Sequence, residues 1–219
     1  MKNMKITKKH FKNFTFNHAI GLLVLIGLVA IIAIITLNLT FVYPWIIQAY
    51  DLEAATGLSS DALMYNYRIL IRYNNWPWIS TLYMPDFPMS TTGEFHFWEV
   101  RVIFQVLQVI GILFFIWLIV SYYKKWPVIK FLNAAGNLAI LIFGVFTVIM
   151  LIDFDFFFYW FHRAFFNNNY WIFDWRTDPV IRALPAELFM IKGFIIIGLL
   201  FFVAMVTKIK FHLDIKKRR

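Results

Sequence analysis

Residues 18–43 read HAIGLLVLIGLVAIIAIITLNLTFVY, a run of 26 residues without Asp, Glu, Lys or Arg. A helix needs about 20 mostly apolar residues to cross the hydrocarbon core of a bilayer. Three more runs reach that length, at residues 102–123, 131–152 and 188–207, and the last is interrupted only by Lys192. Apolar residues make up 61% of the 219, above the share in ordinary soluble domains. The sequence predicts an all-α polytopic membrane protein with four transmembrane helices, built as a single membrane domain over residues 1–219.

The first apolar run follows a group of lysines, as the apolar part of a cleaved signal peptide would. These lysines are Lys2, Lys5, Lys8, Lys9 and Lys12. A signal peptide has an apolar stretch of about 7–15 residues and then a cleavage site of small residues. The run here is longer, and no A-x-A-like site follows it. We therefore interpret it as a retained membrane anchor.

The formal net charge of +9 is unevenly placed along the chain. Five lysines precede the first run, three lie between the second and third, and six basic residues follow the fourth. Eleven of the twelve acidic residues lie in or beside the other two connections. The positive-inside rule then puts both termini in the cytoplasm. Topology and anionic lipid headgroups explain the positive charge, so we expect no nucleic-acid partner.

The two remaining connections, about residues 44–98 and 153–187, are long and hold most of the polar residues. We expect them to form an extracytoplasmic cap. Within the first, GLSSDALMYNYRILIRYNN (57–75) predicts an amphipathic helix capped by Ser59 or Ser60. Apolar residues recur on one face at Leu63, Met64, Tyr67, Leu70 and Ile71, and other faces hold Asn66, Arg68 and Arg72. This helix either lies on the outer leaflet or packs against its neighbours in the cap.

Several kinds of chemistry are excluded by residue type. The absence of cysteine excludes disulfides, thiolate nucleophiles and Cys-ligated metals. Two histidines in the outer connections are too few for a membrane di-iron centre, and no G-x-S-x-G elbow is present. Asp153 and Asp155 would point to different sides of a helix, which disfavours a shared metal. We expect no metal and no cofactor, which leaves general acid–base chemistry by histidine.

The first of these histidines lies in the run DFDFFFYWFHRAFF (153–166). If the third span continues as a helix past Ile152, Asp155, Tyr159 and His162 share one side, and phenylalanines cover another. Ionisable groups at membrane depth are costly and often functional. The alternative is a wet interface in which Tyr159 and His162 meet water and Asp155 pairs with Arg163.

The second histidine, His96, precedes Glu99 by three residues at the entrance to the second span. A helical start would bring the two together, and a carboxylate beside imidazole fixes its tautomer and supports its cation. A purely structural pair is the alternative. Outward arginines either balance acidic residues or meet lipid phosphate or an oxyanion; they are Arg68, Arg72, Arg101, Arg163, Arg176 and Arg182. Lys192 can snorkel outward.

The second outer connection, FHRAFFNNNYWIFDWRTDPVIRALPAELF (161–189), resembles that of the bacterial lipoprotein intramolecular transacylases. The matching positions are His162, Phe165, Phe166, Asn167 to Asn169, Trp171, Asp174, Thr177, Asp178, Leu184, Pro185 and Glu187. The first connection adds GLSSDALMYNYR (57–68) and HFWEVR (96–101). Four spans and inside termini also agree, so the resemblance covers nearly the whole chain from Tyr43 onward.

The resemblance implies that the sn-2 acyl chain of a diacylglyceryl lipoprotein moves onto the α-amino group of its own N-terminal cysteine, leaving a lyso-form. It also implies that His96 and His162 are an essential pair, facing the outer leaflet of the bacterial cytoplasmic membrane. The partners would be diacylglyceryl-modified lipoproteins and membrane lipid.

For this reaction we expect His162 to be the general base, oriented by Asp155 or Tyr159. A cationic His96, held by Glu99, would stabilise the oxyanion or protonate the leaving oxygen, and the two roles could be exchanged. Further orienting or substrate-binding residues are expected at Arg68, Arg163, Asn66, Tyr67, Asn167, Trp171 and Asp174. Two competing hypotheses are a non-catalytic membrane scaffold or lipid-binding accessory protein, and a lipid deacylase that uses the same histidines on water.

Overall fold

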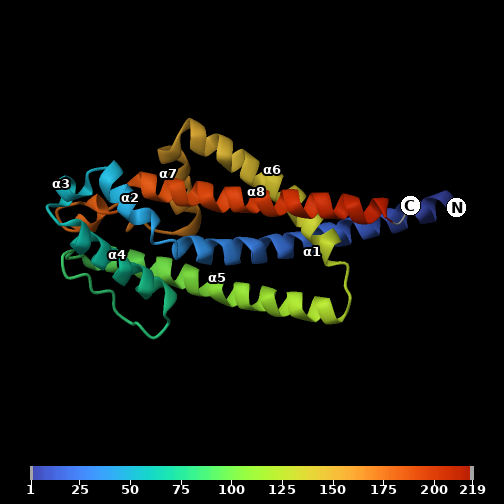
Figure 1. The fold of residues 1–219 in the computed structure, drawn as a ribbon, viewed down its shortest axis with the longest axis horizontal. Helices are drawn as coiled ribbons and strands as arrows, with labels where there is room; N and C mark the ends of the chain where they lie inside the picture. The colour runs from blue at the N-terminus through green and yellow to red at the C-terminus, as the bar shows by residue number, and fades with distance from the viewer. Residues whose placement is uncertain (1, 218–219) are drawn as a thin grey trace. The chain divides into compact units, whose positions relative to one another are not determined.

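The computed structural model describes the backbone of residues 2–217 and the side chains of residues 18–217. The five N-terminal lysines, Arg218 and Arg219, which contribute to the charge argument, have side chains outside that range. Figure 1 shows the helices in chain order: α1 (Lys2–Leu37), α2 (Val42–Ala49), α3 (Leu52–Thr56), α4 (Ser60–Asn75), α5 (Thr91–Tyr123), α6 (Val128–Ile152), α7 (Phe154–Phe165), the 3-10 helix η1 (Pro179–Arg182) and α8 (Ala186–Lys216). Between residues 2 and 217 all regular structure is helical.

Four of these helices are long and apolar enough to cross a membrane: residues His18–Leu37 of α1, and the whole of α5, α6 and α8. The prediction of an all-α protein with four transmembrane helices is therefore confirmed. The first helix ends six residues earlier than the apolar run, because the chain turns after Leu37 and restarts as α2. α5 begins at Thr91, well before residue 102, so that His96 lies in a helix.

The chain divides into two compact units. Unit 1 comprises residues 1–33, 109–148 and 195–219, and unit 2 comprises residues 34–108 and 149–194. In unit 1 the core is made by parts of α1, α5, α6 and α8, with the buried residues Val24, Leu25, Ile32, Phe114, Phe131, Ala135, Ala139 and Leu200. α1 can approach α5 closely here because Gly27 has no Cβ, which would collide with the ring of Phe114.

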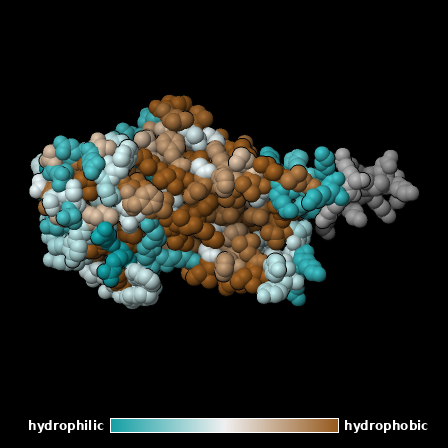
Figure 2. Space-filling view, viewed as in Figure 1, coloured by the Kyte–Doolittle hydropathy of each residue, from teal (hydrophilic) through white to brown (hydrophobic). Residues whose placement is uncertain are grey.

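The exposed surface of the long helices is apolar. Leu113, Phe115 and Leu141 each leave more than half of their area uncovered, and Figure 2 shows apolar side chains over this surface. Hydrophilic side chains gather instead over the part of unit 2 that holds α3 and α4. Contiguous apolar surface of this extent is rare on soluble monomers, which agrees with contact between the long helices and lipid.

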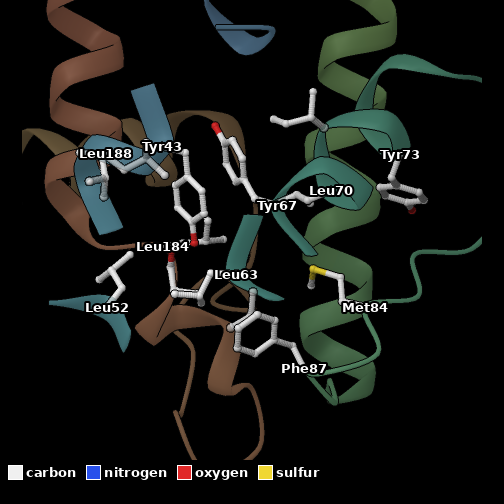
Figure 3. Packing of buried hydrophobic residues seen from close by; sticks show 14 of the residues in the cluster. Tyr43, Leu52, Leu63, Tyr67, Leu70, Tyr73, Met84, Phe87, Leu184 and Leu188 are labelled. Atoms are coloured by element: carbon white, nitrogen blue, oxygen red, sulfur yellow. Dashed lines mark hydrogen bonds between the residues drawn. The ribbon is translucent and has the colours of Figure 1, made fainter. Parts of the chain in front are cut away.

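The core of unit 2 is built around two stacked tyrosines (Figure 3). The rings of Tyr43 on α2 and Tyr67 on α4 lie 4.0 Å apart at 16°. The Tyr43 hydroxyl donates to the carbonyl of Ala183, at 2.7 Å. The aliphatic side chains of Leu63, Leu184 and Leu188 pack around them. The first outer connection is thus fastened to the segment that leads into α8.

The predicted amphipathic helix is α4, and its cap is Ser59, whose side chain accepts from the backbone N–H of Ala62. Its apolar face packs inside unit 2, as the second of the two sequence alternatives requires. Asn66, which the spacing places on a face other than the apolar one, is buried as well. Asn66 is 1% exposed and donates to Asp86 at 2.6 Å. The irregular segment after α4 returns over the helix and supplies this carboxylate, so the buried face is wider than hydrophobic spacing alone indicates.

The third span does not continue as a helix past Ile152, so the condition for one polar side over this run is not met. Asp153 has an extended backbone (φ −154°, ψ 98°), and its side chain accepts from the N–H of Phe156 at 2.9 Å. An aspartate that caps a new helix ends the old one, so α7 is a separate helix. Asp155, Tyr159 and His162 still share α7, but Asp155 and Tyr159 are exposed whereas His162 is buried.

Two cations in unit 2, the half-buried Lys192 and the buried Arg101, contact backbone carbonyls at or just after the ends of helices. The Lys192 ammonium donates to the carbonyls of Thr36 and Leu37, at 2.8 and 3.3 Å, where α1 ends. The Arg101 guanidinium donates to the carbonyl of Pro77 at 2.7 Å, just after α4, and lies 4.8 Å from the Tyr73 ring centroid. Helix C-termini carry partial negative charge, so both cations have a structural role.

Candidate active site

His96 on α5 and His162 on α7 meet inside unit 2. Their ring centroids are 5.9 Å apart, although 66 residues separate them in the chain. His96 is 6% exposed and His162 is 9% exposed. Both residues were predicted as an essential pair only through the family resemblance, and the structure places them side by side.

The tautomer of His162 is set by its own helix. Its Nδ1 lies 2.7 Å from the carbonyl oxygen of Phe158, one turn earlier. A carbonyl can only accept, so Nδ1 carries the hydrogen and Nε2 keeps its lone pair. The expected orientation by Asp155 or Tyr159 is corrected accordingly, because the hydrogen bond goes to the backbone. Burial lowers the pKa of His162 below its ordinary value of 6.5, and the hydrogen bond to the Phe158 carbonyl partly opposes this shift.

Aromatic rings surround the two imidazoles. Phe158 lies 4.0 Å from the ring of His162 and Trp171 lies 4.8 Å from it, between centroids. Phe166 contacts both histidines, with its ring centroid 4.7 Å from that of His96 and 5.5 Å from that of His162. Tyr159 reaches this group only through Trp171, at 5.6 Å. These apolar rings lower the effective dielectric constant around the imidazoles, which strengthens electrostatic interactions there and favours a neutral imidazole.

Glu99 is close to His96 but does not hydrogen-bond to it. The Nδ1 of His96 and the Oε2 of Glu99 are 3.9 Å apart, which is beyond hydrogen-bonding distance. Both atoms are buried without a hydrogen-bond partner among the described residues. The other carboxylate oxygen, Oε1, accepts from the Nδ2 of Asn168 at 2.8 Å. Glu99 therefore lies near His96, as predicted, but does not hydrogen-bond to it.

Asn168 was not singled out from the sequence. It stands in the middle of three consecutive asparagines, and nothing in the run NNN distinguishes one from another. In the structure its side chain is half-buried and reaches Glu99, whereas Asn167 and Asn169 are exposed.

The second outer connection is fastened to the start of α5 by Asp178, which is 3% exposed. Its carboxylate accepts from the N–H of Ser90 at 2.8 Å, from the Ser90 hydroxyl, and from the hydroxyl of Thr177 at 2.7 Å. Gly93 allows this contact, because a Cβ there would collide with the carboxylate. A negative charge at a helix N-terminus is also favourable. His96 follows Gly93 by less than one turn.

The other predicted substrate-binding residues are dispersed. Asn66 and Tyr67 belong to the packed region around Tyr43, and Arg68 is exposed on α4. The remaining four lie in the second connection. Trp171 contacts His162, Arg163 donates to Asn169, Asn167 is exposed, and Asp174 pairs with Arg176. That pairing lowers the pKa of Asp174 to about 2. Within residues 18–217, no three His, Asp or Glu side chains are grouped as a metal site requires.

Comparison with known proteins gives a family and a fold. The family described as lipoprotein intramolecular transacylase Lit matches residues 18–189. A solved structure of the membrane-integral lipoprotein intramolecular transacylase Lit from Bacillus cereus is 25% identical, with a TM-score of 0.82 over 94% of this chain and 98% of that chain.

Two variants of the Bacillus cereus protein, each with one histidine replaced, have the same fold. The arginine variant is 24% identical, with a TM-score of 0.72 over 97% of this chain and 98% of that chain. The alanine variant is 23% identical, with a TM-score of 0.76 over 98% of this chain and 99% of that chain. No curated protein matches. With a family match over residues 18–189 and four helices that can span a membrane, the chain belongs to the lipoprotein intramolecular transacylases and is a multi-pass membrane acyltransferase.

Proposed function

We propose that the enzyme moves the sn-2 acyl chain of a diacylglyceryl lipoprotein onto the α-amino group of that lipoprotein's N-terminal cysteine. The observation that carries the proposal is the meeting of His96 and His162 in an aromatic surrounding, 5.9 Å apart. Two titratable groups placed together in an apolar site are the usual arrangement for acid–base catalysis.

The substrate itself supplies both reacting groups. Attack of the amine on the sn-2 carbonyl carbon closes a ring of roughly eight atoms. Intramolecular positioning of this kind lowers the activation free energy by several kcal/mol. The new bond joins the nitrogen to the acyl carbon, and the bond that breaks joins that carbon to the glyceryl oxygen. The nitrogen loses one proton and the glyceryl oxygen gains one, so the step consumes no water.

His162 acts as the general base in this proposal. Its Nδ1 hydrogen is directed to the carbonyl of Phe158, so Nε2 is the atom that accepts the proton from the attacking amine. A lowered pKa keeps the ring neutral near pH 7. General base catalysis of this kind contributes about 10²- to 10⁴-fold.

His96 acts as the donor to the oxyanion that forms on the acyl carbonyl, and then to the leaving glyceryl oxygen. One well-placed donor of this type contributes about 3 kcal/mol. Two positive rings at this separation would repel each other, so only one imidazole carries the proton at a time. The carboxylate of Glu99 supports the positive charge when it resides on His96. The sequence analysis expected His96 to be cationic before the reaction. In the present proposal His96 is neutral at rest and receives the proton from His162 during the reaction.

The acyl chains would pack on the aromatic side chains of α7. Trp160, Phe161 and Phe165 are each more than 40% exposed, and rings of this kind bind apolar chains at a membrane interface. The charge distribution of the sequence supports a site at the outer leaflet of the bacterial cytoplasmic membrane, with both termini inside.

The test is the N-terminal lipopeptide of a reporter lipoprotein in a bacterium whose lipoproteins are otherwise diacylated. The parent enzyme should give the N-acyl lyso-form by mass spectrometry, and His162→Ala should give the diacyl form. If His162→Ala yields lyso-form at the parent rate, the base assignment is wrong. Free fatty acid without N-acylation would identify a deacylase. Two ester-linked chains and no fragment ions of an N-terminal amide, with every variant and with the parent, would identify a scaffold.

A further inference from the structure

Asn168 makes contacts on both sides of the histidine pair. Its Nδ2 donates to Oε1 of Glu99, the carboxylate beside His96, at 2.8 Å. Its backbone carbonyl accepts from the indole Nε1 of Trp171, the ring beside His162, at 3.0 Å. Its Oδ1 accepts from the N–H of Tyr170 at 3.0 Å, which closes a tight turn.

We propose that Asn168 is a positioning residue for the transfer reaction, which holds Glu99 against His96 and Trp171 against His162 through these contacts. The inference rests on the function proposed above and extends it to a residue that touches neither histidine. Asn168 joins the α5 side of the site to the loop after α7, so the separation of the two imidazoles depends on it.

Of these two contacts, the side-chain hydrogen bond to Glu99 is expected to have the larger effect on catalysis. The Glu99 carboxylate is largely covered, and the hydrogen bond from Asn168 satisfies only one of its oxygens. A buried carboxylate without donors is costly, so removal of this amide would let Glu99 rotate away from His96. The 3.9 Å gap between Glu99 and His96 leaves no direct hydrogen bond that could hold the carboxylate in place.

The contact with Trp171 is made by the backbone carbonyl of Asn168. A substitution at Asn168 therefore affects this hydrogen bond only if it changes the backbone conformation of the turn. Asp in place of Asn168 retains the oxygen that accepts from Tyr170 and replaces the amide that donates to Glu99 with a second carboxylate. Asn168→Asp therefore removes the hydrogen bond to Glu99 and retains the other two contacts. Asn168→Ala removes the whole side chain and serves as the second variant if the aspartate impairs folding.

The experiment measures kcat and KM for conversion of a synthetic diacylglyceryl lipopeptide by the purified full-length enzyme in detergent. Substrate and product have the same mass, so the product is quantified by the fragment ions of its N-terminal amide. We expect Asn168→Asp to lower kcat by about 10- to 100-fold with KM unchanged, because misplacement of a catalytic group by about 1 Å has effects of that size. Asn169→Ala is the matched control, since that side chain bonds to the exposed Arg163 instead. It should keep the parent kcat.

A double-mutant cycle tests whether the effect passes through Glu99. In a Glu99→Gln background, Asn168→Asp should lower kcat much less than in the parent, because the glutamine amide can donate to the introduced carboxylate. An equal fold-loss in both backgrounds, a parent kcat for Asn168→Asp, or an effect confined to KM would each overturn the proposal.

The same assay separates this inference from the proposed function. If His96→Ala and His162→Ala are inactive while Asn168→Asp and Asn168→Ala keep the parent kcat, only the role of Asn168 fails. If the histidine variants are as active as the parent, the proposed catalytic pair fails and the role of Asn168 falls with it. Melting temperatures of all variants in detergent identify any loss of activity that comes from unfolding.

Discussion

The carboxylate of Asp178 fastens the second outer connection to the start of α5, so its removal is expected to loosen the site without touching either histidine. Asp178 is almost fully buried, and it accepts from the Ser90 N–H, the Ser90 hydroxyl and the Thr177 hydroxyl. The change to test is Asp178→Ala. It removes the acceptor from all three donors.

The expected magnitude follows from the number of donors. A hydrogen bond to a charged group contributes roughly 1.5 kcal/mol at the low end, so three give roughly 4.5 kcal/mol. For a chain of this size, 1 kcal/mol corresponds to about 2–4 °C in melting temperature, which predicts a fall of roughly 9–18 °C. Because His96 lies on α5 only six residues after Ser90, kcat should fall as well at temperatures where the variant remains folded.

The assay is thermal unfolding in detergent, followed by activity on a synthetic diacylglyceryl lipopeptide. Asp214→Ala is the control, because its ion pair with Lys210 joins residues one turn apart at the surface of α8 and pairs of that kind contribute little. A melting temperature for Asp178→Ala equal to that of Asp214→Ala would refute the reasoning.

Three further outcomes are expected. The acid limb of the pH–rate profile should inflect below pH 6.5, because burial lowers the pKa of His162 and activity is lost when falling pH protonates this base. An inflection above pH 6.5 would contradict this prediction. Lys192→Met should lower the melting temperature, because the carbonyls at the end of α1 lose their donor, at a cost of about 1–3 kcal/mol. Gly27→Ala should cost about 1–3 kcal/mol through overpacking against Phe114, as measured by denaturation, whereas Gly144→Ala meets open space and should not.

Much of the fold could be predicted because membrane crossing imposes a simple requirement on sequence. Four apolar runs gave four helices, and Ser59 gave the cap of α4. The helix boundaries were less accurate, because periodicity does not show where a polar side chain starts a new helix. Asp153 was considered only as a metal ligand beside Asp155, whereas it caps α7 and ends α6.

The site could be predicted only in part, because its geometry depends on contacts between distant segments. The pairing of His96 with His162 followed from a family pattern and from no feature of local spacing. The burial of Asn66 depends on a segment that returns over α4 with Asp86, and the position of Asn168 depends on which of three identical residues turns toward Glu99. Tertiary contacts of this kind leave no periodic signal in the sequence.

The central claim is intramolecular acyl transfer by the paired histidines, and the N-terminal lipopeptide mass spectrum tests it most directly. With the parent enzyme, the cysteine of a reporter lipoprotein should carry one N-linked acyl chain and one remaining glyceryl ester, at the same total mass as the diacyl substrate, with the fragment ions of an amide. Both His96→Ala and His162→Ala should leave the two ester-linked chains in place. N-acylation at the parent rate in either variant would contradict the claim.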